Sequence, residues 1–267
     1  MSFSLLSYNT FNNRGFEKIK NIIDQYHPDI ICVQEVVTEE KNLTKLKKEN
    51  YLLADFSNSF INFGKIYGVA TFYNSKKFKF IDSFPLKLGN NIPEILFTLI
   101  QILIGFKKSK TILKTDFIDQ KSKKKITICN VHLYVIASNN LRINHLNQAL
   151  RSLNLDNQSR LIIAGDFNYF PYQRKKLERL MKRFQLKEAT KKINQTIKFN
   201  YNESTSIMFG SFQKLALFIF KKIRLFTRVT NQLKIDYIFY RNLGLKKTER
   251  IEVSYSDHYP IISTFES

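Results

Sequence analysis

The sequence predicts an α/β protein in which two β-sheets pack against each other and are flanked by helices. Short apolar runs typical of buried strands recur along the chain, and a few helical patterns lie between them. No Gly- or Pro-rich linker and no internal repeat divides the chain, and the alternation lacks the regular rhythm of a doubly wound parallel sheet. We therefore expect residues 1–267 to form one domain, a length that can bury a sizeable core.

The first predicted elements are a strand, a helix and a second strand. Apolar residues predict a strand over residues 3–9, and apolar residues at three-to-four spacing between 16 and 26 predict a helix. The helix ends before Pro28, because the residue preceding a proline is pushed out of the helical region. Residues 29–34 then form a buried strand.

Two pairs of strands are expected in the middle of the chain. Residues 69–73 and 77–82 have the pattern of neighbouring strands joined by a short turn-like link. Residues 111–118 and 125–133 are typical of a hairpin around a polar stretch.

The C-terminal half mixes helices with strands. A helix near residues 141–153 precedes a buried strand over residues 161–164. A second helix spans about residues 173–184, with four side chains facing inward: Leu177, Leu180, Met181 and Phe184. The last predicted strands cover residues 234–240, 249–254 and 260–265.

Two apolar insertions, near residues 85–110 and 205–232, interrupt this scheme. Residues 92–106 are nearly all apolar, but this run is shorter than the roughly 20 residues that cross a bilayer as a helix. Residues 207–226 form a basic amphipathic pattern, compatible with attachment to a membrane surface. The alternative is that the two segments pack on each other or cap the sandwich, since an apolar helical stripe usually faces a core.

The formal net charge of +21 favours anionic partners, namely nucleic acid, an acidic membrane surface or phosphorylated substrates. The alternative is a Lys- and Asn-rich composition that only keeps the protein soluble. The basic residues are spread along the chain and are not confined to one tail. No protein partner can be inferred.

The two cysteines, Cys32 and Cys129, lie in apolar strand-like runs, so we expect buried free thiols. Two cysteines are too few for a disulfide framework or a thiolate zinc site. The N-terminus has neither the basic region nor the apolar core of a secretory signal. The default expectation is a cytoplasmic location, with peripheral membrane association as an alternative.

Polar or acidic side chains recur where the predicted strands end. Asp166 and Asn168 directly follow the apolar residues 161–164, and the pair Asp257-His258 lies far downstream. The other strand-end residues are Asn9, Glu35 and His132. This repetition predicts one oxygen-rich site able to hold a hard divalent cation.

These strand ends resemble the endonuclease/exonuclease/phosphatase superfamily from about Leu6 to Phe265. The motifs that carry the resemblance are Ser7-Tyr8-Asn9, Val33-Gln34-Glu35, Asn130-Val131-His132-Leu133, Gly165-Asp166-Phe167-Asn168, Ile235-Asp236-Tyr237-Ile238-Phe239 and Ser256-Asp257-His258-Tyr259-Pro260. Each motif alone is weak, but six in order, each at a strand end, are specific. The resemblance implies a four-layer α/β sandwich of two packed, mostly antiparallel sheets flanked by helices.

The resemblance also implies a metal-dependent hydrolase of phosphoester bonds, with Mg²⁺ as the cofactor and Mn²⁺ as a substitute. The residues that match the family's metal ligands are Asn9, Glu35 and Asp257. Those that match residues serving the phosphate and its nucleophile are His132, Asp166, Asn168, Asp236 and His258. From side-chain chemistry, Asp166 would orient or deprotonate the attacking water, and Asp236 would orient the imidazole of His258.

Several of these residues also have purely structural interpretations. Asp166 and Asn168 could form an Asx-type turn, and Glu35 could cap a helix that begins near residue 38. His132 at a strand end could be structural. A buried Asp236 needs a partner in any case, and His258 is the natural one.

The net charge and the usual roles of the superfamily that the chain resembles favour nucleic acid as the substrate, with Lys and Arg around the cleft neutralising backbone phosphates. The alternative is a phospholipid phosphodiesterase of the sphingomyelinase kind, or a phosphoinositide phosphatase, whose apolar insertions rest on an anionic or sphingolipid membrane. A third hypothesis is a non-catalytic binding module on the same scaffold. The chain lacks the paired cysteines of secreted deoxyribonucleases and the basic-aromatic recognition loop of apurinic endonucleases.

Overall fold

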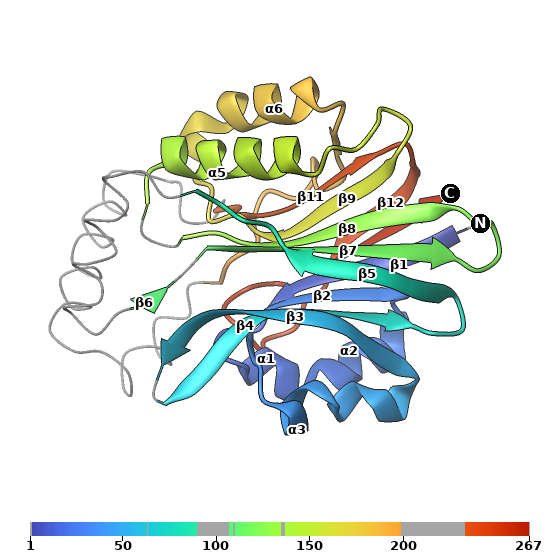
Figure 1. Cartoon of the computed structure of the whole chain (residues 1–267). Helices are drawn as coiled ribbons and strands as arrows, with labels where there is room; N and C mark the ends of the chain where they lie inside the picture. Colours follow the sequence, from blue (N-terminus) through green and yellow to red (C-terminus); the bar gives the residue numbers. More distant parts are fainter. Residues whose placement is uncertain are drawn as a thin grey trace, which may run out of the picture.

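The computed structural model describes residues 2–62, 64–89, 107–108, 110–134, 137–198 and 233–266. Two sheets pack face to face with helices on both outer sides, so the predicted four-layer sandwich is confirmed (Figure 1). The seven-stranded sheet, sheet A, has the order β12 (Gly244–Arg250), β13 (Ile261–Glu266), β1 (Ser2–Asn9), β2 (Ile30–Val37), β4 (Lys65–Asn74), β3 (Tyr51–Asn62) and β6 (Lys107–Lys108). The six-stranded sheet, sheet B, has the order β10 (Lys187–Glu188), β11 (Asp236–Arg241), β9 (Arg160–Asp166), β8 (Lys125–His132), β7 (Thr111–Asp119) and β5 (Phe78–Pro85).

Each sheet contains one parallel pair of strands among its described strands. In sheet A this pair is β1 and β2, and in sheet B it is β8 and β9. The other described pairings are antiparallel, as expected for the mostly antiparallel sheets. Because each parallel pair lies near the middle of its sheet, its carboxyl ends bring loops from distant parts of the chain to one edge.

The helices cover the outer faces of the two sheets (Figure 1). The helices on sheet A are α1 (Arg14–Glu17), α2 (Ile19–Tyr26), α3 (Glu40–Leu43) and the 3₁₀ helix η1 (Lys45–Glu49). Sheet B carries α5 (Asn139–Ser152), the 3₁₀ helix η2 (Pro171–Gln173) and α6 (Arg174–Arg183). Leu177, Leu180 and Met181 of α6 are buried, as their spacing predicts.

Three apolar layers hold the sandwich together. The layer between the sheets contains side chains such as Leu5, Ile128 and Ile238, all fully buried. Separate clusters lie under α1 and α2 and under α5 and α6. The central strands are therefore covered on both faces, and every residue of β2 is buried.

The structure corrects several predictions of the elements, beginning with the partners of two strands. The strands near residues 69–73 and 77–82 are not neighbours, because β4 lies in sheet A and β5 in sheet B. The link between them is a corner at which the chain changes sheets, and Phe78 enters the layer between the sheets against Phe3 and Phe117. A short polar link has the same sequence pattern at a hairpin and at such a corner.

Further corrections concern a misplaced strand, a strand that was not predicted and the N-terminal helix. The strand predicted over residues 249–254 is wrong over most of its length, because β12 spans Gly244–Arg250 and residues 251–254 are not in a strand. Strand β3 was not predicted, because its middle carries polar residues at half-buried and exposed positions and lacks an apolar run. The predicted N-terminal helix is present but is interrupted at Lys18, which separates α1 from α2.

Cys32 and Cys129 are buried free cysteines, as predicted, and burial raises the pKa of the Cys129 thiol to about 12. The two apolar segments at residues 92–106 and 207–226 lie outside the described residues. Within the described ranges, none of the helices combines the length and the apolar character needed to span a bilayer.

Candidate active site

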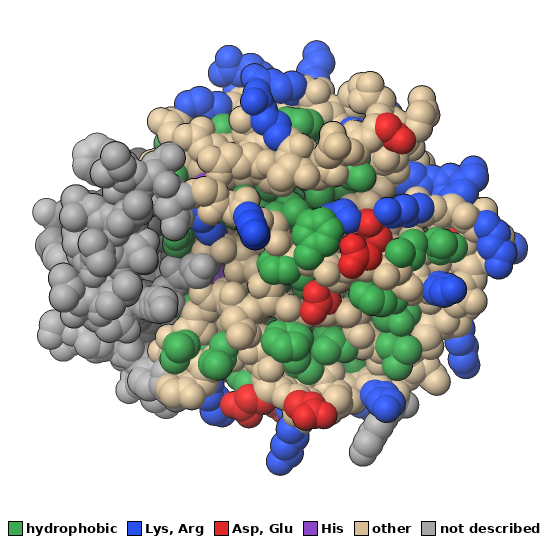
Figure 2. Space-filling view, in the orientation of Figure 1, with side chains coloured by type: hydrophobic (Ala, Val, Ile, Leu, Met, Phe, Trp, Pro, Cys, Tyr) green, Lys and Arg blue, Asp and Glu red, His purple; other side chains and the backbone are tan. Residues whose placement is uncertain are grey.

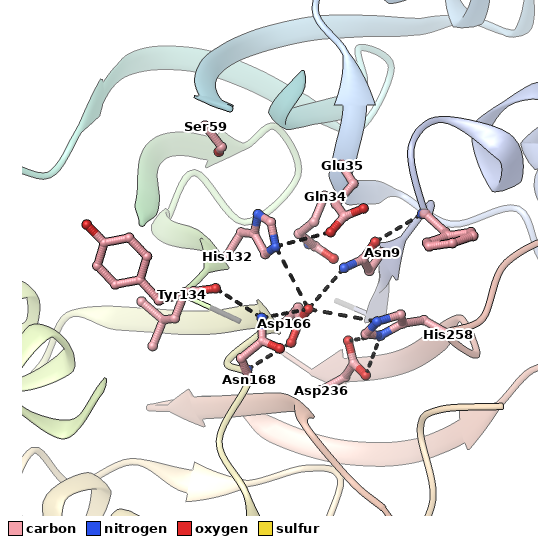
Figure 3. Close-up of polar contacts among 12 residues, drawn as sticks. Asn9, Gln34, Glu35, Ser59, His132, Tyr134, Asp166, Asn168, Asp236 and His258 are labelled. Atoms are coloured by element: carbon pink, nitrogen blue, oxygen red, sulfur yellow. Dashed lines mark hydrogen bonds and ion pairs between the residues drawn. The ribbon is translucent and has the colours of Figure 1, made fainter. Parts of the chain in front are cut away.

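The strand register places three polar side chains side by side at one edge of sheet B. Asp166, the last residue of β9, is paired with His132 at the end of β8 and with Asp236 at the start of β11. β11 runs antiparallel to β9, so its first residue meets the last residue of β9. Asn9 ends β1 of sheet A and reaches across to the same place, as Figure 3 shows.

Asp166 is the centre of this cluster and is almost completely buried. Its Oδ2 accepts hydrogen bonds from Nδ2 of Asn9 at 3.0 Å and from Nδ2 of Asn168 at 3.1 Å. Its Oδ1 accepts from the backbone N–H of Asn168 at 2.8 Å. Neutral amide donors thus surround a carboxylate that lies between two histidines.

The two histidines approach Asp166 from different elements. Nε2 of His132 and Nε2 of His258 each lie 3.9 Å from Oδ2 of Asp166, which is longer than a hydrogen bond. The Nε2 atoms of the two histidines and the carboxylate of Asp166 therefore face one small volume, and neither Nε2 is hydrogen-bonded to the carboxylate. This arrangement can contact a water molecule and a phosphate together.

The backbone around Asp166 depends on two unusual conformations. Gly165 has a φ of 143°, and a Cβ at this position would lie 2.0 Å from the carbonyl oxygen of Val131. Asn168 has a φ of 49°, a left-handed conformation that asparagine tolerates. Its Nδ2 also donates to the carbonyl of Leu133 at 3.0 Å, which ties the loop to the end of β8.

Asp236 and His258 form a buried pair. Nδ1 of His258 lies 2.9 Å from Oδ2 and 3.1 Å from Oδ1 of Asp236, so the imidazole donates its Nδ1–H to the carboxylate. This bond fixes the ring and leaves Nε2 directed toward Asp166. The backbone of His258 is held by Oγ of Ser256, which also donates to the carbonyl of Asn9 at 2.8 Å.

Glu35 lies in a β-bulge of β2, with a φ of 55°. Its Oε2 accepts from the backbone N–H of Asn12 at 3.2 Å, and its Oε1 lies 3.6 Å from Nε2 of His132. The supporting turn contains three consecutive residues with positive φ, namely Phe11, Asn12 and Asn13. Strain of this kind persists where the surroundings hold it, and it is common at functional sites.

The electrostatics of the cluster follow from its burial. Burial raises the pKa of Asp166 above its usual range, and the nearby Asp236 carboxylate adds to the rise. Burial alone would lower the pKa of His258, but the charges of Asp236 and Asp257 raise it well above its ordinary value of 6.5. The raised pKa makes the Asp166 carboxylate a better proton acceptor, and the raised pKa of His258 favours its imidazolium form.

The side chains of Asn9, Glu35 and Asp257 carry oxygen atoms of the kind that a hard divalent cation takes as ligands. Burial raises the pKa of Asp257, and the negative charges of Glu35 and Asp166 raise it further. Such clustered, partly desolvated carboxylates are stabilised by a cation that accepts oxygen ligands. One potential ligand atom from each of Asp166, Asp236 and His258 also lies within 4.8 Å of the other two, but Asp236 and His258 already bond to each other.

The structure brings all eight predicted site residues to one region. Sequence reasoning named two further buried amides, Gln34 and Asn130, only as members of the motifs and assigned them no role. Nε2 of Gln34 donates to Oδ1 of Asn130 at 2.7 Å, and Asn130 donates to the carbonyls of Val33 and Ala70. This pair joins the two sheets, and in the sequence each amide interrupts an apolar run within one of the six motifs.

Comparison with known families gives one match over most of the chain. A family model described as the endonuclease/exonuclease/phosphatase family matches residues 6–258. A search of curated proteins finds no match.

Several solved structures are similar to this chain over nearly its whole length. The human Nocturnin catalytic domain with bound sulfate has a TM-score of 0.70 at 18% identity, covering 99% of this chain and 94% of that chain. TDP2 of D. rerio, complexed with a single-strand DNA product, has a TM-score of 0.65 at 14% identity, covering 100% and 99%. A mannosyl-6-phosphatase of Bacteroides thetaiotaomicron has a TM-score of 0.64 at 16% identity, covering 99% and 100%. At these identities the similarity establishes the shared fold.

Proposed function

The chain belongs to the endonuclease/exonuclease/phosphatase family, whose members hydrolyse phosphoester bonds, and from this premise we propose that it is a Mg²⁺-dependent phosphodiesterase that cleaves nucleic acid. One observation carries the proposal. The buried carboxylate of Asp166 receives hydrogen bonds from Asn9 and Asn168 and lies 3.9 Å from a nitrogen of each of two histidines.

Asn9, Glu35 and Asp257 would hold the metal ion, since they supply the oxygen ligands that Mg²⁺ prefers. When bound, the cation would offset negative charge on the phosphoryl oxygens in the transition state.

The remaining residues act on the water and the phosphate. Asp166 orients the attacking water and accepts its proton, a role that its raised pKa favours because a more basic carboxylate takes a proton more readily. Asn168 holds the water or a phosphate oxygen. His258, protonated and fixed by Asp236, donates from Nε2 to a phosphate oxygen. His132 donates to another phosphate oxygen or assists the leaving group.

Two observations support nucleic acid as the substrate class. The net charge of +21 attracts polyphosphate backbones, and electrostatic attraction of this kind dominates nucleic-acid affinity. The similar D. rerio TDP2 structure holds a single-strand DNA product. The lipid hypothesis relied on the segments at 92–106 and 207–226, which lie outside the described residues.

A substrate panel with matched variants tests the proposal. The purified chain is assayed on single-stranded DNA, RNA, plasmid DNA and phosphoinositide- or sphingomyelin-containing vesicles, each with Mg²⁺ and with EDTA. We expect cleavage of nucleic acid that EDTA stops and Mg²⁺ restores. Asp166→Ala should lower kcat by about 10³-fold or more.

The matched control is Asp24→Ala, which removes an exposed carboxylate from α2 and should keep the wild-type rate. Cleavage that ignores EDTA, or near-normal turnover in Asp166→Ala, would contradict the proposed mechanism. Hydrolysis of the vesicle lipids alone would replace the proposed substrate.

A further inference from the structure

Two stacked aromatic rings, those of Phe170 and Tyr172, lie just after the loop that carries Asp166 and Asn168. Tyr172 lies in η2, four residues after Asn168, and 71% of it is exposed. Its ring stacks on that of Phe170, with centroids 6.4 Å apart and an angle of 17° between the planes. Among the described large apolar and aromatic residues, it is the most exposed.

The inner ring of this pair is firmly held. The guanidinium of the fully buried Arg142 lies 5.0 Å from the centre of the Phe170 ring. Asn139 accepts from the backbone N–H of Phe170 at 3.1 Å and donates to its carbonyl at 2.9 Å. Tyr172 therefore rests on an anchored partner, so that a flat ligand stacking on it would meet a preorganised surface.

Positive charge lies beside the exposed ring. Lys175, Lys176 and Arg179 are exposed on α6 and line an open hollow together with Tyr172. Figure 2 shows Lys and Arg side chains gathered over α6, the helix at the top of that view. An exposed aromatic ring bordered by cations is the combination that binds single-stranded nucleic acid, with a base on the ring and phosphates on the cations.

We propose that Tyr172 and the exposed basic residues of α6 bind the part of a single-stranded nucleic acid that extends beyond the scissile phosphate. One base stacks on Tyr172, and neighbouring phosphates contact Lys175, Lys176 and Arg179. The loop that carries Asp166 and Asn168 continues directly into this surface, so one strand can reach both places. This inference rests on the proposed function, since it extends the binding site of the same substrate.

Binding of a fluorescent single-stranded 12-mer, measured by anisotropy in EDTA so that no cleavage occurs, tests both parts of the surface. Tyr172→Ala should weaken binding roughly tenfold, the loss expected for one stacked base. Tyr172→Phe keeps the ring and should bind like the wild type. The triple variant Lys175→Gln, Lys176→Gln, Arg179→Gln should lower the slope of log Kd against log salt by about 2.

A control variant elsewhere in the chain loses three positive charges, as the α6 triple variant does. Lys121, Lys123 and Lys124 are exposed in the β7–β8 turn, at the opposite end of β8 from His132. Replacing these three with Gln should leave the affinity of the α6 surface nearly unchanged. Equal losses in the two triple variants would mean that only overall charge matters, and would overturn the proposal.

A fluorescence experiment tests stacking itself. The chain contains no Trp, so Tyr172→Trp introduces a single tryptophan on the stacked pair. Oligonucleotides should quench its emission, whereas heparin or an oligonucleotide of abasic residues should not. Equal quenching by all of these polyanions, or no quenching by the oligonucleotides, would contradict base stacking.

The experiments distinguish a failure of this surface proposal from a failure of the proposed function. If the wild type cleaves oligonucleotides but Tyr172→Ala binds them normally, the surface proposal is wrong and the proposed function stands. If the wild type neither binds nor cleaves single-stranded nucleic acid, both are wrong.

Discussion

At the scale of single residues, the bond between Asp236 and His258 has the clearest consequence for activity. The carboxylate both orients the imidazole and raises its pKa, while Nε2 remains directed toward Asp166. Neither residue can perform its proposed role without the other. Residues that act as one unit give losses that do not add when both are changed.

We therefore predict that Asp236→Asn lowers kcat by about 10²- to 10⁴-fold, because the imidazole loses its fixed orientation and its raised pKa. His258→Ala should cause a similar loss, and the double variant should be no worse than either single variant. Steady-state kinetics on the best substrate of the panel, with folding checked by circular dichroism, measures this. Losses that multiply in the double variant would show that the two residues act independently.

At the scale of elements, a buried ion network joins α6, β10 and the start of β11. Glu188 of β10 accepts from Lys234 Nζ, from Arg174 of α6 and from Thr190 Oγ1 at 3.0 Å. Burial would raise the pKa of Glu188, but Lys234 and Arg174 outweigh this and lower it below 4.5. Burial in turn lowers the pKa of Lys234 to about 8. The network positions the strand that carries Asp236.

Glu188→Gln should lower the free energy of unfolding by about 3 kcal/mol at pH 7, because it leaves the buried ammonium of Lys234 without its counter-charge. The folded state holds this carboxyl with a depressed pKa, so its contribution is complete above pH 4.5 and is lost as the pH falls further. Urea unfolding at pH 7 and pH 3 should show a smaller difference from the wild type at pH 3.

The control for this prediction is Glu178→Gln. Glu178 also accepts from Arg174, at 2.9 Å, but its side chain is 52% exposed. Its replacement should change stability by no more than about 1 kcal/mol. A Glu188→Gln variant as stable as this control would argue against the buried network.

At the scale of the whole molecule, the site exists only because the two sheets are docked. Asn9 and Glu35 belong to sheet A, whereas His132, Asp166 and Asp236 belong to sheet B. The proposed metal ligands thus lie on one sheet and its C-terminal loop, and the proposed acid–base residues lie mainly on the other. Binding of an ion or a substrate between them favours the packed state.

Mg²⁺ should therefore raise the unfolding temperature of the wild type. At about 100 times Kd, a ligand specific for the folded state contributes about 2.7 kcal/mol, which corresponds to several degrees for a chain of this size. Glu35→Gln should remove this shift, whereas Glu17→Gln, which changes an exposed glutamate on α1, should keep it. Differential scanning calorimetry with and without Mg²⁺ measures the effect, and an unchanged shift in Glu35→Gln would reject Glu35 as a ligand.

The sequence by itself determined the fold class, most strands and the residues worth testing. Apolar periodicity is a local property, so it predicted β1, β9 and α6 directly, and polar residues at strand ends identified Asp166 and His258 before any distance was known. The tertiary structure decided which sheet each strand joined, as at the corner between β4 and β5, because strand partners are chosen by long-range packing. It also decided the register that sets His132, Asp166 and Asp236 side by side, and the docking that brings Asn9 to them, since those contacts join residues up to 157 positions apart.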